Sequence, residues 1–175
     1  ADKEIYPFAY FGNNKLVHVK DLPTDFYKHR ELVNYNDKDL REVFAYNRYL
    51  FSLFDNLALK SYYDENDFHS QFNRHEISYN KAKLDLIDSL IQDESIKNNL
   101  LKYKTRDFIS HSLDDNEIQE MLAYYKSKST NEEDITNMDQ LVEAINSLKP
   151  GNNFPELELV NINEENKVIA DLIDK

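Results

Sequence analysis

The segment NDKDLREVFAYNRYLFSLFDNLALKSYY, residues 36–63, decides the fold class of this chain. Its apolar side chains recur three and four residues apart, which is the spacing of one face of an α-helix. The stripe comprises Leu40, Val43, Phe44, Asn47, Leu50, Phe51, Phe54 and Leu57. Asp37 can cap the start of this helix, and Tyr46 and Tyr49 beside the stripe indicate burial on more than one side. The residues predicted to be buried are Phe44, Leu50, Phe51, Phe54 and Leu57.

Helical spacing continues along most of the remaining chain. It predicts a short helix within residues 21–33 and one long helix, or two in series, over residues 65–91. Asp93 is placed to cap a further helix. Capping-box spacing, with Asp114 before Glu117 and Thr130 before Glu133, marks two more helix starts. Pro150 and Gly151 end the last helix.

The chain has 175 residues with only two glycines and four prolines, a composition typical of long helices joined by short turns. We predict a mostly α fold, an irregular helical bundle of about five or six helices with a short C-terminal β-hairpin. The predicted organisation is an extended N-terminal arm at residues 1–20, a helical domain at residues 21–149, and a separate C-terminal segment at residues 150–175.

Composition excludes several classes of function. The formal charge of −12 repels the phosphate backbone, so we do not expect nucleic acid as a partner. No apolar run reaches the roughly 20 residues that span a bilayer, and the first ten residues lack the apolar core of a signal peptide. The absence of cysteine excludes a disulfide, a thiolate metal site and a cysteine nucleophile within this chain.

No catalytic, cofactor or metal site is predicted. The stretch HEISY opens like a zinc-protease helix, but Tyr79 stands where the second histidine is required. His69 and His75 are six residues apart and would point in different directions on a helix. The acidic residues Asp64, Glu65 and Asp67 are typical of helix capping rather than of a calcium loop.

Aromatic and apolar residues near the two ends form a candidate interaction surface. The N-terminal arm alternates aromatic residues, and the C-terminal segment alternates leucines. The candidate residues are Tyr6, Phe8, Tyr10, Phe11, Leu157 and Leu159. Packing inside a core is the alternative interpretation of the aromatic group.

The ending FPELELVNINEENKVIADLIDK, residues 154–175, resembles the entrance to a thioredoxin-like domain of the TlpA/ResA type of thiol-disulfide oxidoreductase. The match lies in a first strand with Pro155, Leu157 and Leu159, and in a second with Val168, Ala170 and Leu172. Glu164, Glu165 and Asn166 stand in the turn where the family usually has a glycine. The earlier pieces DLPTDFY, DNLAL, LIDSLI and KNNLLKY resemble the helical segment before that domain in certain Bacteroidetes members.

The resemblance implies a non-catalytic accessory domain in the periplasm or cell envelope, truncated before the catalytic Cys-x-x-Cys. Its implied partner is the C-terminal thioredoxin-like domain of the same polypeptide, with client proteins or a second copy as further candidates. An isolated hairpin is marginally stable, so it folds back on the helices, is covered by a partner, or is disordered. The alternative function is a free-standing helical module that binds a peptide or a glycan, and a hydrolase is the least favoured.

Overall fold

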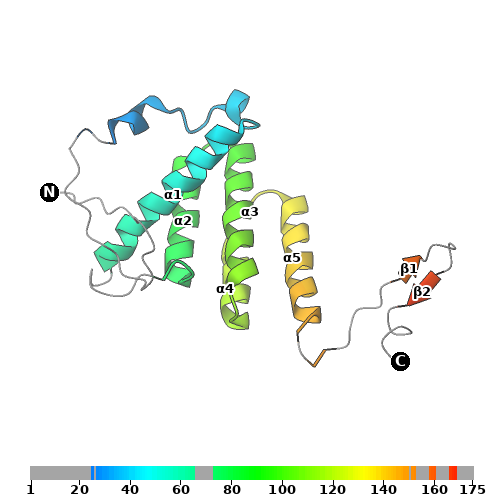
Figure 1. Cartoon of the computed structure of the whole chain (residues 1–175). Helices are drawn as coiled ribbons and strands as arrows, with labels where there is room; N and C mark the ends of the chain where they lie inside the picture. Colours follow the sequence, from blue (N-terminus) through cyan, green and yellow to red (C-terminus); the bar gives the residue numbers. More distant parts are fainter. Residues whose placement is uncertain are drawn as a thin grey trace. The chain divides into compact units, whose positions relative to one another are not determined.

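The computed structural model describes residue 25 and residues 27–65, 73–149, 151–152, 158–160 and 166–168. Within these residues the protein is mostly α-helical, as the sequence predicts (Figure 1). The α-helices are α1 (Phe44–Glu65), α2 (Ile77–Leu90), α3 (Glu94–His111), α4 (Asp115–Lys126) and α5 (Glu132–Ser147). Two 3₁₀ helices, η1 (Lys28–Leu32) and η2 (Lys38–Leu40), precede α1. None of the described helices is long and apolar enough to cross a membrane.

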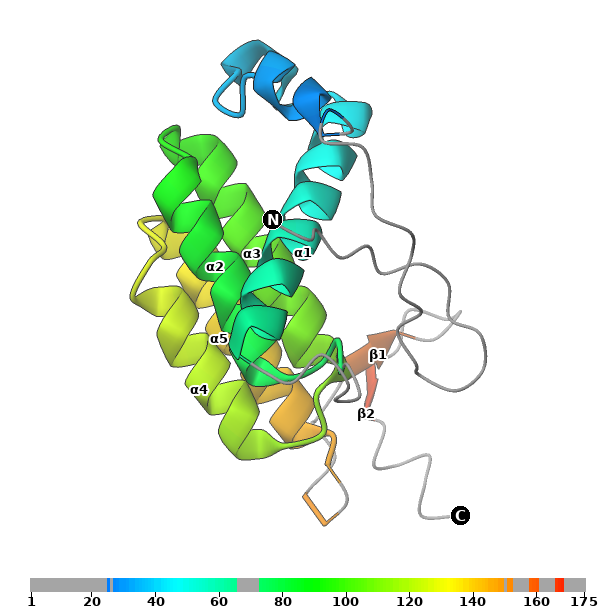
Figure 2. The same ribbon diagram turned by 90° about the vertical axis from the view of Figure 1, so that its left-hand side faces the viewer.

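Two compact units divide the chain, Ala1–Ile135 and Thr136–Lys175. In the first unit α1 packs on α2, α2 on α3, and α3 on α4, while α2 also contacts α4. Figures 1 and 2 show α1 crossing obliquely over the α2 and α3 pair. The second unit contains the remainder of α5 and two short strands, β1 (Glu158–Val160) and β2 (Asn166–Val168), which pair antiparallel with Leu159 opposite Lys167.

The core of the first unit is apolar and draws on all four of its complete α-helices. The buried apolar residues of α1 are Tyr46, Leu50, Leu53, Phe54, Ala58, Leu59 and Tyr62. Those of α2 to α4 are Tyr79, Leu84, Ile87, Ile96, Leu100, Leu101, Phe108, Ile109, Ile118, Met121, Leu122 and Tyr125. Burial of these faces, at about 25 cal/mol per Å² of apolar surface, is the main term that holds the helices together.

The buried stripe of α1 is rotated from the predicted one. Leu50 and Phe54 are fully buried as predicted, whereas Phe51 and Leu57 are only partly buried. The prediction for Phe44 is wrong, because its side chain is 75% exposed at the first residue of the helix. Tyr46 is buried instead, since its hydroxyl donates to the carbonyl oxygen of Asn34 at 2.9 Å and so carries its polar end inside. The two candidate stripes are similarly apolar, and only the neighbouring helices distinguish them.

Helix starts agree with the predicted caps at two of four places. Asp93 accepts from the Ile96 amide at the start of α3, and Asp114 accepts from two amides at the start of α4. Asp37 caps η2 rather than α1. Asn131, not Thr130, caps α5 by accepting from the Asp134 amide at 3.1 Å.

Candidate functional site

The predicted interaction surface falls largely beyond what the structure describes. Tyr6, Phe8, Tyr10, Phe11 and Leu157 lie outside the described residues, and so does most of the predicted turn. Leu159 is placed in β1 by its backbone alone. The contribution of these residues to binding therefore stays a prediction.

The structure gives His75 a spatial neighbour that the sequence did not indicate. Its ring lies 5.6 Å from that of His111 at the end of α3, measured between ring centroids. Burial lowers the pKa of His75, and the adjacent positive charge of Arg74 lowers it further. Among the described residues no group of three or more His, Cys, Asp or Glu side chains could hold a metal ion. The two rings form a tilted aromatic contact, and His69 lies outside the described residues.

Three charged side chains meet inside the helical unit, and we call them the ion centre: Asp55 on α1, Lys83 on α2 and Lys104 on α3. Oδ1 of Asp55 lies 3.0 Å from Nζ of Lys83 and 2.7 Å from Nζ of Lys104. Both lysines are only 5% exposed. Asn80 accepts a second hydrogen bond from Lys83 at 3.1 Å, and the Tyr79 ring lies 4.1 Å from the same ammonium.

Opposing effects set the protonation of the ion centre. Burial would raise the pKa of the Asp55 carboxyl, but the two lysine charges outweigh burial and hold that pKa below its ordinary value of 3.8. Burial also lowers the pKa of Lys83, with Asp55 opposing the shift. The carboxylate keeps 41% of its side-chain surface exposed, so solvent screens it in part. The ion centre therefore joins α1, α2 and α3 through one carboxylate and two nearly buried amines.

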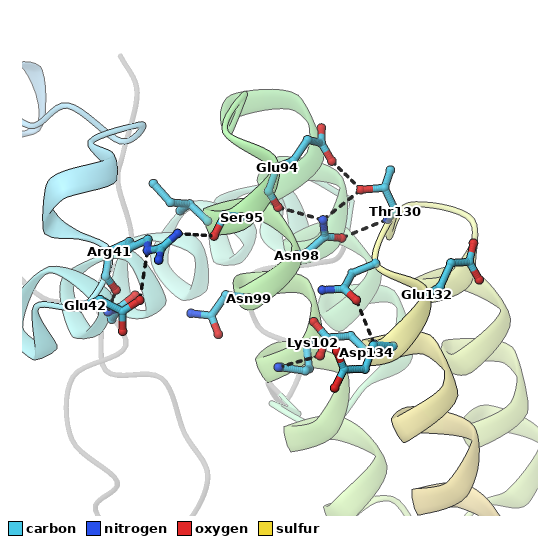
Figure 3. A pocket seen from close by; sticks show the side chains of 14 residues that line it. Arg41, Glu42, Glu94, Ser95, Asn98, Asn99, Lys102, Thr130, Glu132 and Asp134 are labelled. Carbon is cyan, nitrogen blue, oxygen red and sulfur yellow. Dashed lines mark hydrogen bonds and ion pairs between the residues drawn. The ribbon is translucent and has the colours of Figure 1, made fainter.

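An open polar hollow of about 760 Å³ lies elsewhere in the same unit (Figure 3). It is bounded by the residues around the start of α1, by the first turns of α3, and by the segment that enters α5. The lining residues are Arg41, Glu42, Asn47, Glu94, Ser95, Ile96, Asn98, Asn99, Lys102, Thr130, Asn131, Glu132, Glu133 and Asp134. We call this hollow the acidic pocket, because five of these side chains are carboxylates and two are cationic.

Asn98 holds one wall of the acidic pocket in place. Its amide group donates to the Glu94 carbonyl at 2.8 Å and to the Thr130 hydroxyl at 2.9 Å. Its carbonyl oxygen accepts from the Ser129 hydroxyl at 2.8 Å and from the Thr130 amide at 3.0 Å. One buried side chain thus takes part in all four hydrogen bonds, as donor in two and as acceptor in two. These bonds hold the turn before α5 against the first turns of α3.

Polar contacts of Arg41 and Lys102 connect the segments at two edges of the pocket. Arg41 pairs with Glu42 at 3.0 Å and donates to the Ser95 hydroxyl at 3.4 Å. Lys102 pairs with Asp134 at 2.8 Å, which links α3 to the first turn of α5 (Figure 3). The walls of the pocket are therefore connected by polar contacts, and its lining is almost entirely polar or charged.

No family model matches this chain, and no curated protein and no solved structure is significantly similar to it. The candidate site therefore rests on geometry alone. Sequence reasoning missed both the ion centre and the acidic pocket. One signal was available in the sequence. Lys83 is next to Leu84, and Lys104 is three residues after Leu101, so each lysine lies close along its helix to an apolar residue that is buried.

Proposed function

We propose that this chain is a non-catalytic binding domain that accompanies a thioredoxin-like domain of the TlpA type in the periplasm or cell envelope. The observation that carries the binding role is the acidic pocket, a hollow whose walls are tied together by Asn98, by the Lys102–Asp134 ion pair and by the Arg41–Ser95 hydrogen bond. The redox association rests on the sequence pattern of residues 154–175, including the proposed entrance hairpin.

A role without chemistry of its own agrees with the composition. The chain has no cysteine, so it offers no thiolate for disulfide exchange. Asp55, the carboxylate with two lysine partners, is held in its charged form by those lysines. The proposed work of the domain is to position the redox domain, to hold client proteins, or to bind a second copy.

A free-standing helical binding module is the second candidate, and the same pocket favours it. The two candidates differ in the coding sequence expected after Lys175 in the native gene. The experiment is to read that gene past this position and look for a Cys-x-x-Cys within the next few dozen codons. Its presence supports the accessory domain, and an early stop codon supports the free-standing module.

A purified sample of the present chain provides a second measurement. We expect no turnover in an insulin-reduction assay, because reduction requires a thiolate. Reductase activity that persists after removal of contaminating oxidoreductases would contradict the non-catalytic assignment.

A further inference from the structure

The acidic pocket has a net negative charge even when the partial positive charges of the nearby helix N-termini are included. Five carboxylates and two cationic side chains line it. The N-terminal ends of α3 and α5 meet the pocket, and each contributes roughly half a positive charge. That contribution is smaller than the excess of carboxylates, so the field in the pocket favours a cation.

The two cationic side chains of the pocket are already engaged with its own carboxylates. Arg41 is paired with Glu42, and Lys102 is paired with Asp134. Glu133 has no ion pair or hydrogen bond through its side chain to any part of the chain that the structure describes. An anionic ligand would have to break an existing pair, whereas a cationic ligand finds an uncommitted carboxylate.

Exposed apolar side chains adjoin the pocket in sequence. Val43 and Phe44 directly follow the lining residues Arg41 and Glu42, and they are 43% and 75% exposed. Aromatic side chains are enriched at protein interfaces relative to the rest of the surface. Phe44 is thus an exposed apolar side chain two residues after a lining residue of the pocket.

We propose that the acidic pocket binds a basic, partly apolar segment of a partner polypeptide. Lysine or arginine side chains of that segment enter the pocket near Glu133, and an apolar side chain of the segment packs on Phe44. The charge of −12 on the whole chain steers such a segment toward the domain. This inference rests on the proposed binding role and names its partner class as basic client polypeptides.

Binding is measured by fluorescence anisotropy at about 0.15 M salt, where exposed charges beyond roughly 8 Å are screened. Three labelled twelve-residue peptides serve as probes: one of lysine and leucine, one of glutamate and leucine, and one of lysine and serine. We expect the lysine–leucine peptide to bind at least about tenfold more tightly than the other two, a difference of about 1.4 kcal/mol. Equal binding of the glutamate–leucine peptide overturns the charge assignment, and equal binding of the lysine–serine peptide overturns the proposed apolar contact with Phe44.

Matched variants locate the interaction. Glu133→Gln should weaken binding roughly three- to tenfold, as expected for the loss of one interfacial charge. Glu143→Gln removes an equal charge from an exposed position on the same helix, outside the pocket lining, and should leave affinity unchanged. Asn99→Arg places a cation in the pocket and should abolish binding, with thermal unfolding used to confirm that the variant folds. Equal losses for Glu133→Gln and Glu143→Gln would indicate general charge attraction and would overturn the site.

Competition separates a polypeptide from a small polycation. Spermine is added at a concentration that gives the same total positive charge as the unlabelled lysine–leucine peptide. It should displace the labelled peptide poorly, because spermine has no apolar side chain to pack on Phe44. Displacement by spermine as effective as displacement by unlabelled peptide overturns the polypeptide assignment. The outcome is independent of the coding sequence after Lys175, so failure here and failure of the redox association are distinguishable.

Discussion

Nζ of Lys104 donates to Oδ1 of Asp55 at 2.7 Å, and this hydrogen bond joins α3 to α1 inside the helical unit. Lys83 of α2 shares the same carboxylate oxygen at 3.0 Å. Two nearly buried ammonium groups thus depend on one carboxylate. The centre ties three helices together at a single point, and its charge makes the fold sensitive to changes there.

Asp55→Asn should destabilise the protein by about 2 kcal/mol. Breaking a fully buried pair costs about 3–5 kcal/mol, and a surface pair contributes about 0–1 kcal/mol. Asp55 falls between these limits, because its side chain is 41% exposed while both lysines are buried. The measurement is the free energy of unfolding in urea. Asp88→Asn is the control, since Asp88 is 40% exposed and pairs with Lys97 and Lys128 at longer distances, so its loss should stay below about 1 kcal/mol.

The contribution of Asp55 should disappear in acid. Its pKa in the folded protein lies below the ordinary value of 3.8, so the folded state binds fewer protons than the unfolded state near that pH. The stability it provides is present above the unfolded pKa and is lost as pH falls through the folded pKa. The difference in unfolding free energy between wild type and Asp55→Asn should be constant from about pH 5 to 7 and should narrow below about pH 4. A difference that is independent of pH down to about pH 2.5 would contradict a charged role for this carboxylate.

Truncations along α1 test which of its faces is buried. Leu50→Ala should cost roughly 2–5 kcal/mol, the range for a fully buried leucine. Phe51→Ala should cost less, about 1–2 kcal/mol, because Phe51 is partly exposed and its ring stacks on the half-exposed Tyr103 ring, with centroids 4.0 Å apart. Phe44→Ala should cost below about 0.5 kcal/mol. The measurement is the free energy of unfolding of each variant in urea. A larger loss for Phe44→Ala than for Leu50→Ala would show that the face of α1 predicted from the sequence is the buried one.

Asn98→Ala should lower the free energy of unfolding by about 2 kcal/mol. It removes the acceptor for the Thr130 amide and the Ser129 hydroxyl, and an unsatisfied buried polar group costs about 1–3 kcal/mol. The neighbouring Asn99→Ala is the control, because Asn99 is exposed and should change stability by less than about 0.5 kcal/mol. Hydrogen exchange at the Thr130 amide should accelerate in Asn98→Ala alone, and equal exchange in both variants would show that Asn98 does not hold this turn.

Deletion of residues 150–175 tests the predicted domain boundary. If this segment belongs to a thioredoxin-like domain, the core of the first unit forms without it, and the urea midpoint and slope should change little. If it packs on the helices instead, each buried apolar side chain that is lost removes about 1.5–3 kcal/mol. A midpoint that collapses, or the loss of cooperative unfolding, would place the boundary elsewhere.

Local physical chemistry accounts for the part of the fold that the sequence by itself determined. The helical class, the caps at Asp93 and Asp114, and the buried positions Leu50 and Phe54 follow from spacing and from hydrogen bonds within a few residues. The cap of α5 was misplaced by one residue. Thr130 and Asn131 are both able to cap, but the Thr130 hydroxyl is engaged with Asn98 and Glu94, and Asn131 accepts from the Asp134 amide instead.

Tertiary structure alone decided which face of α1 is buried and which charged groups meet. Phe44 and Tyr46 both have large aromatic side chains that suit a core. Tyr46 is buried because neighbouring groups cover its ring and the Asn34 carbonyl accepts a hydrogen bond from its hydroxyl, whereas Phe44 stays exposed. Asp55, Lys83 and Lys104 lie on three separate helices, so no spacing along the chain relates them. Their juxtaposition depends on helix crossing angles, and the walls of the acidic pocket likewise come together only when distant helices pack.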